Sequence, residues 1–122
     1  MQKITLIGTA LGLLLAAQAQ ANEAPLTGTL AKVANAKSIT LGYRDASGPF
    51  SYVGDNTGKP MGYSVDLASK IVERIQQKTG VPKLNVKYNL VTSQTRIPLV
   101  INGTVDLECG STGVTAERQK QV

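Results

Sequence analysis

Apolar side chains recur every four residues in one stretch of the chain, and this spacing predicts its clearest helix. Leu67, Ile71 and Ile75 fall on one face of a helix that we expect over residues 63–78. Ser64 can cap the start of this helix, because a serine hydroxyl accepts from the free N–H groups of a first turn. A glycine and a proline follow within four residues and end the helix.

Short segments rich in β-branched and apolar residues predict four strands. These segments are residues 38–43, 50–53, 86–91 and 105–109. Further helices are expected over residues 29–36, from about residue 95 and from residue 115. The alternation of strands and helices predicts an α/β fold with a mostly parallel sheet flanked by helices.

The first 21 residues predict a cleavable signal peptide. Lys3 precedes an apolar run over residues 4–17, and residues 19–21 read Ala-Gln-Ala, an A-x-A cleavage pattern. The run is too short for a membrane-spanning helix and contains polar and glycine interruptions. We therefore expect an exported protein, in which residues 22–37 form a lead-in with a possible short helix.

Arginines and hydroxyl groups follow the ends of three expected strands. Arg44 follows the first strand, residues 93–96 (Ser-Gln-Thr-Arg) follow the third, and residues 111–118 follow the fourth. In open α/β sheets, ligands bind at the carboxyl edge of the strands, and free N–H groups at a helix start favour anions. The pattern predicts one site for a small anionic ligand. The alternative is a set of polar loops with solvated arginines.

Composition narrows the function classes. The net charge of +5 is spread along the chain without runs, and tryptophan is absent, so no nucleic-acid surface is predicted. Histidine is also absent and Cys109 is the single cysteine, which excludes Cys/His nucleophilic pairs and histidine-containing metal sites within this chain. We expect no catalytic residue, metal or cofactor. Cys109 is either half of a disulfide whose partner lies elsewhere or a buried thiol.

Several longer motifs resemble one known family. The runs GYRDASGPFSY, GYSVDLASKIVERI, TSQTRIPLVINGTVDLECGST and AERQKQ are similar to the start of glutamate/aspartate-binding proteins of bacterial ABC importers, in the polar amino-acid solute-binding family. The resemblance covers nearly all of the chain after the signal peptide and less than half of a complete family member. It implies that residues 38–122 are an incomplete first lobe of a two-lobe periplasmic-binding-protein fold of type II, truncated at its end.

The resemblance assigns the α-carboxylate and α-ammonium of an amino acid to the last loop. Arg118 matches the arginine of a T-x-x-R motif and would take the α-carboxylate, with backbone N–H groups at Gly113. The Ser111 carbonyl would accept from the α-ammonium, and Thr112 belongs to the same loop. The family usually has threonine where this chain has Gly113, so one hydroxyl to the ligand is lost.

The resemblance assigns the side-chain carboxylate of the ligand to Arg44, Ser93 and Arg96. Relatives that bind basic amino acids carry an acidic residue at the position of Arg44, so an arginine there implies an acidic ligand, glutamate or aspartate. Cys109 matches a cysteine that pairs with one in the later half of the family's chain. Together these implied roles describe a non-catalytic binding subunit.

The implied protein is periplasmic, monomeric when complete, and delivers its ligand to an ABC permease in the inner membrane. Two alternatives remain. A ligand-binding sensory domain of a receptor would have the same fold. A dehydratase-like enzyme on this scaffold would need a general base, for which the loops offer only Asp45.

Overall fold

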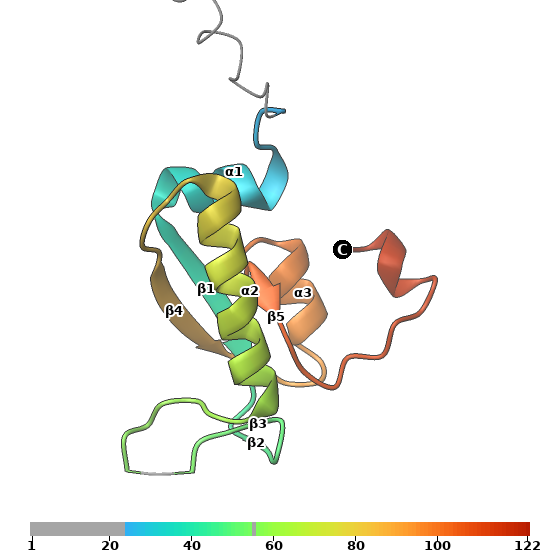
Figure 1. Cartoon of the computed structure of the whole chain (residues 1–122). Helices are drawn as coiled ribbons and strands as arrows, with labels where there is room; N and C mark the ends of the chain where they lie inside the picture. The colour runs from blue at the N-terminus through green and yellow to red at the C-terminus, as the bar shows by residue number, and fades with distance from the viewer. Residues whose placement is uncertain (1–23, 55) are drawn as a thin grey trace, which may run out of the picture.

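Strand β1 (Ser38–Tyr43) lies in the middle of a three-stranded sheet, between β4 (Asn85–Leu90) and β5 (Leu107–Glu108) (Figure 1). The computed structural model describes residues 24–54 and 56–122, so the expected signal peptide lies outside the described residues. Both neighbours run parallel to β1. The predicted α/β fold with a mostly parallel sheet is therefore confirmed.

Strand β1 pairs with β4 over its whole length, from Ser38 opposite Asn85 to Tyr43 opposite Leu90. It pairs with β5 over a shorter stretch that includes Leu41 opposite Leu107. Because the three strands are parallel, their carboxyl ends meet at one edge of the sheet, at the bottom of Figure 1. The loops that leave this edge are those predicted to carry the ligand site.

Helices α1 (Gly28–Ala36) and α2 (Tyr63–Thr79) pack against one face of this sheet. Helix α2 crosses in front of the strands in Figure 1, and α1 lies near the start of β1. The core between them consists of buried aliphatic side chains and one alanine: Val33, Ile39, Leu41, Ala68, Val72 and Leu84. The helices predicted over residues 29–36 and 63–78 are thus confirmed.

The buried face of α2 differs from the predicted one by one position. Leu67 is 46% exposed, whereas Ser64, Ala68 and Val72 are the buried residues of the helix. Small side chains at the first two of these positions let the helix backbone approach the sheet closely, which a leucine would prevent. Ser64 does not cap the helix, because the capping position is Gly62 and Ser64 already lies in the first turn.

Strands β2 (Ala46–Ser47) and β3 (Ser51–Tyr52) form a separate antiparallel hairpin. Strand β2 was not predicted from the sequence, and the strand predicted over residues 50–53 contains β3, which does not join the main sheet. The hairpin is tied to the start of α2. At Gly62, with φ of 116°, a Cβ atom would lie 2.6 Å from the carbonyl oxygen of Phe50, so only glycine fits.

The last part of the chain is less regular than predicted. Helix α3 (Arg96–Ile101) forms as expected, but the strand predicted over residues 105–109 is limited to β5. The helix predicted from residue 115 is limited to the 3-10 turn η1 (Arg118–Lys120). Across residues 24–54 and 56–122, none of the helices has the length and apolarity that a membrane crossing requires.

Asp106 completes the contact between β1 and β5. Its backbone N–H donates to the carbonyl of Thr40 at 2.9 Å, and its carboxylate accepts from the Thr40 N–H at 2.8 Å. The same carboxylate pairs with Lys32 of α1 at 2.7 Å, and its side chain is only 5% exposed. The Asp106 carboxylate therefore has a structural role, because it contacts both β1 and α1.

We expect Asp106→Ala to lower the free energy of unfolding by about 2–4 kcal/mol. The substitution leaves the Thr40 N–H without its charged acceptor, and hydrogen bonds to charged groups contribute about 1.5–3 kcal/mol each. Lys32→Met should cost less than about 1 kcal/mol, because the Lys32 side chain is 51% exposed. Urea unfolding of the two variants measures the difference. Equal losses would contradict the central role of the carboxylate.

Candidate functional site

The loops after β1 and β4 bring two predicted site residues together. Arg44 follows the last residue of β1, and Ser93 lies three residues beyond the end of β4. Since the two strands are parallel neighbours, both loops leave the same edge of the sheet. The Nη1 atom of Arg44 donates a hydrogen bond of 3.3 Å to the Ser93 hydroxyl. The Ser93 side chain is exposed, so this pair faces solvent.

The turn that carries Ser93 is closed by two threonines. The Thr92 N–H donates to the Thr95 hydroxyl at 2.9 Å, and the Thr95 N–H donates to the Thr92 hydroxyl at 3.1 Å. This reciprocal pair resembles a capping box, in which side chains satisfy the free N–H groups before a helix. It holds Ser93 at the edge of the sheet and directs the chain into α3.

Arg96 is buried, which the sequence interpretation did not predict. Only 7% of the residue is exposed, and its Nε and Nη1 atoms have no hydrogen-bond partner among the described residues. Arg96 lines a cavity of about 250 Å³ with Ile97 and Val100 of α3 and with Glu108. Buried arginines are rarely without a partner, and the two candidates for this guanidinium are the Glu108 carboxylate in the same cavity and an anionic ligand.

Glu108 shares this cavity with Arg96. Its Oε2 atom accepts a hydrogen bond of 2.7 Å from the Thr112 hydroxyl, while Oε1 is buried without a partner in the described part of the chain. Thr112 is thereby fixed to β5 through a side chain. Strand alternation in the sequence does not show which face α3 covers, so it could not predict that Glu108 shares this cavity with Arg96.

The remaining predicted residues lie in the segment after β5, which leaves the sheet edge toward the right of Figure 1. The Nη1 atom of Arg118 donates to the carbonyl of Gly113 at 2.9 Å. Ser111 is exposed in the same segment. No hydrogen bond or ion pair joins Arg118 to Arg44, Ser93 or Arg96 within the described ranges. The structure therefore brings Arg44 to Ser93 and Arg118 to Gly113, as two separate pairs.

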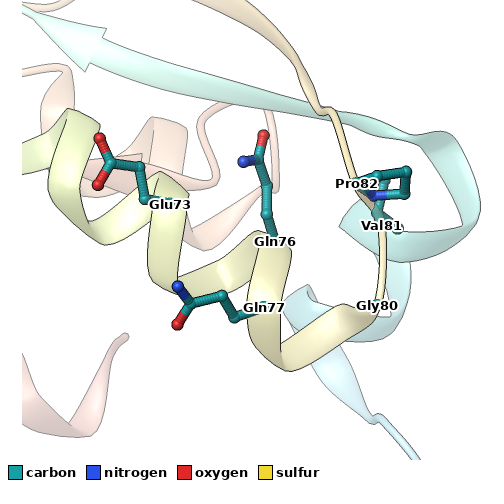
Figure 2. A pocket seen from close by; sticks show the side chains of 6 residues that line it. All are labelled: Glu73, Gln76, Gln77, Gly80, Val81 and Pro82. Atoms are coloured by element: carbon teal, nitrogen blue, oxygen red, sulfur yellow. The ribbon is translucent and has the colours of Figure 1, made fainter.

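Another hollow lies away from this edge. It measures about 420 Å³ and lies at the opposite end of α2, around Gly80 and Pro82 (Figures 1 and 2). Its polar side chains are engaged: Gln76 accepts from the Leu84 N–H at 2.9 Å, and Glu73 pairs with Lys70 at 3.1 Å. With no arginine in its lining, this hollow does not fit the predicted anion site.

The parallel sheet has arginine and serine side chains in the loops at its carboxyl edge. This arrangement is that of an α/β lobe of the type II periplasmic-binding class. The chain belongs to the bacterial extracellular solute-binding proteins, family 3, whose sequence model matches residues 39–122. The predicted resemblance is thus confirmed at the level of the family.

Individual relatives match over most of this chain and over a minor part of their own length. An L-glutamate/L-aspartate-binding protein of Pseudomonas aeruginosa is 59% identical over 119 residues, which are 97% of this chain and 39% of the relative. A glutamate/aspartate import solute-binding protein of Escherichia coli is 51% identical, over 84% of this chain and 34% of its own. The chain therefore spans about two fifths or less of these relatives.

The fold also matches solved structures. The solute receptor for L-cysteine of Neisseria gonorrhoeae superposes with a TM-score of 0.64 at 26% identity, over 77% of this chain and 36% of the receptor. The parallel sheet with its helices is therefore the lobe architecture of this class, and the solved relative is nearly three times as long as the matched part.

Cys109 is a partly buried cysteine at the end of β5. It directly follows β5, packs against the core cluster and is a free thiol in the structure. Burial raises the pKa of the Cys109 thiol, and the neighbouring Glu108 carboxylate raises it further, because both disfavour the thiolate. The thiol is therefore less reactive at neutral pH than an exposed cysteine.

We expect reduced Cys109 to be alkylated by iodoacetamide with a pH midpoint above that of the urea-unfolded chain, since the thiolate is the nucleophile. Because the folded pKa is raised, the protonated thiol favours the fold below the unfolded pKa, and this contribution is lost as pH rises through the folded pKa. Glu108→Gln removes one cause and should lower the midpoint. A folded midpoint at or below the unfolded one would contradict this assignment.

Proposed function

We propose that this chain supplies the first lobe of a periplasmic binding protein that captures an acidic amino acid, glutamate or aspartate, for import by an ABC permease. The observation that carries the proposal is the cationic edge of the sheet. Arg44 is paired only with a neutral hydroxyl, and the buried Arg96 has two nitrogens without partners in the described residues. Two such arginines, which follow neighbouring strands, favour an amino acid that carries a side-chain carboxylate besides its α-carboxylate.

In this proposal, Arg44, Ser93 and Arg96 hold the side-chain carboxylate of the ligand. Ser93 positions the Arg44 guanidinium through their 3.3 Å hydrogen bond, and its hydroxyl can donate to the ligand. Arg96 lies within the same turn-to-helix segment, and its burial strengthens its interaction with an anion because the local dielectric constant is low. The names of the P. aeruginosa and E. coli relatives, which bind glutamate and aspartate, support this ligand class.

In the same proposal, the loop after β5 binds the α-carboxylate and α-ammonium of the ligand. Thr112 of this loop donates a hydrogen bond to Glu108. Arg118 would bind the α-carboxylate with the N–H of Gly113, and the carbonyl of Ser111 would accept from the α-ammonium. This role requires Arg118 to leave the Gly113 carbonyl that it now contacts at 2.9 Å and to approach the sheet edge. The proposal therefore includes a rearrangement of the segment after β5 on ligand binding.

A binding function is favoured over catalysis. The described edge carries arginines and hydroxyls; Asp45 is exposed, and the Glu108 carboxylate is held by Thr112. The relatives reported above are named as binding proteins. A receptor sensory domain remains the second candidate on the same fold. We further propose that the complete protein is a periplasmic monomer, exported by the predicted signal peptide, with the inner-membrane permease as its partner and no role in nucleic-acid binding.

We expect Arg44→Ala, in the complete two-lobed protein, to weaken glutamate and aspartate by about one to two decades in Kd. Hydrogen bonds to charged groups contribute about 1.5–3 kcal/mol, and each decade corresponds to about 1.4 kcal/mol. Glutamine should lose much less, because its amide is neutral. Arg118→Ala should instead weaken all three ligands alike, since each presents an α-carboxylate. Isothermal titration with the three amino acids measures these differences.

Arg74→Ala is the matched control for these variants. Arg74 is an exposed arginine of α2 that, among the residues the structure describes, hydrogen-bonds to Gln77 alone, at 2.9 Å, so its loss should leave every Kd unchanged. If Arg44→Ala binds glutamate as tightly as this control does, the side-chain pocket is assigned wrongly.

We also propose that Cys109 forms a disulfide with a cysteine from the later part of the complete protein, as the resemblance implies. The exported, oxidised protein should then show no free thiol at this position before reduction, whereas residues 22–122 alone should show one. Thiol labelling followed by mass spectrometry distinguishes the two states. Complete labelling of Cys109 in the unreduced, denatured complete protein would rule the disulfide out.

A further inference from the structure

Ser51 is a fully buried serine that contacts both backbone groups of Arg44. Only 1% of its surface is exposed. Its hydroxyl donates to the Arg44 carbonyl at 2.9 Å and accepts from the Arg44 N–H, also at 2.9 Å. The Ser51 hydroxyl thus provides hydrogen-bond partners for both backbone groups of Arg44, the first residue of the candidate site.

Arg44 needs such a partner because it lies just beyond the paired part of β1. The register of β1 with β4 ends at Tyr43, whose carbonyl accepts from the Val91 N–H at 2.9 Å. The next carbonyl and N–H along the chain therefore have no strand beside them. A buried backbone group without a partner is costly, so the Ser51 hydroxyl stabilises this one conformation of the loop.

The hairpin that carries Ser51 is itself anchored on both sides. The Val53 N–H donates to the carbonyl of Asp45 at 3.0 Å, one residue beyond Arg44. At the other side, the N–H of Ser64 in α2 donates to the carbonyl of Phe50 at 2.8 Å. The position of the Arg44 backbone is thus coupled through Ser51 to the hairpin and the start of α2.

We propose that Ser51 is a positioning residue for the selectivity of this site toward acidic amino acids. By fixing the Arg44 backbone it sets where the guanidinium meets Ser93 and, through that pair, where the side-chain carboxylate of the ligand is held. This inference rests on the proposed function, because it assigns to Ser51 a role in the subsite that Arg44 forms. The Ser51 side chain does not itself touch the ligand.

A purely structural role makes a different prediction. If Ser51 only stabilised the lobe, its loss would lower the melting temperature and would weaken every amino-acid ligand to the same extent. If it positions Arg44, its loss should act on glutamate and spare glutamine, and it should have little further effect once Arg44 is absent. The ratio of the two affinities therefore separates the two roles.

The experiment measures glutamate and glutamine Kd values for the complete protein by isothermal titration, with Ser51→Ala, Arg44→Ala and the double variant. We expect Ser51→Ala to weaken glutamate about tenfold and glutamine less than about threefold, the loss of roughly one hydrogen bond's contribution at the carboxylate. In the Arg44→Ala background, Ser51→Ala should weaken glutamate less than about twofold further. Equal losses for both ligands, or a full tenfold effect in the Arg44→Ala background, would overturn the proposal.

Ser64→Ala is the matched control, because Ser64 is a buried serine that contacts the same hairpin through its backbone N–H, which the substitution keeps. It should leave the ratio of glutamate to glutamine affinity unchanged. If Ser51→Ala does not fold, Ser51→Cys, which keeps a weak donor and acceptor at similar size, should shift the ratio in the same direction. Failure of the parent protein to bind glutamate or aspartate would overturn the proposed function, whereas normal parental binding with an unchanged ratio would overturn only the role of Ser51.

Discussion

Strand β1 has to satisfy its backbone on both sides, and the chain provides regular partners for only part of it. β4 pairs with all six residues on one side, but β5 is two residues long on the other. Two residues supply what is missing. Asp106 accepts from the Thr40 N–H through its carboxylate and donates to the Thr40 carbonyl through its own backbone N–H. Ser51 of β3 bonds both backbone groups of Arg44 through its hydroxyl.

This arrangement explains which parts of the fold could be predicted from the sequence. The predicted helices over residues 29–36 and 63–78 and the strands of the main sheet follow from local periodicity, and they correspond to observed elements. The hairpin of β2 and β3 could not be predicted in the same way. Two-residue strands have no periodicity, and this pair is stabilised by contacts to Arg44 and to the start of α2, which lie outside its own sequence.

The candidate site was predictable in its residue types and less so in its geometry. The positions of Arg44 and Ser93 after parallel strands predicted that they lie together at one edge of the sheet, as the structure has them. Their spacing could not show that Arg96 is buried, because six residues of α3 are too few for a reliable amphipathic pattern. Nor could it show that Arg118 contacts the Gly113 carbonyl, since this pair depends on the path of an irregular segment.

The burial of Arg96 affects both the stability of the lobe and its affinity for an anionic ligand. Taking a guanidinium out of water costs several kcal/mol, and the cost is offset only when charged or polar partners surround it. In the described structure the Nε and Nη1 atoms have no such partner, and the Glu108 carboxylate in the same cavity is engaged with Thr112 through one oxygen. An anionic ligand at this edge would satisfy Arg96 in the bound state alone. Under the proposed function, a bound carboxylate offsets the unfavourable burial of Arg96 in the free lobe, which raises the affinity for a ligand that carries one. The same side chain therefore couples ligand binding to the stability of the lobe.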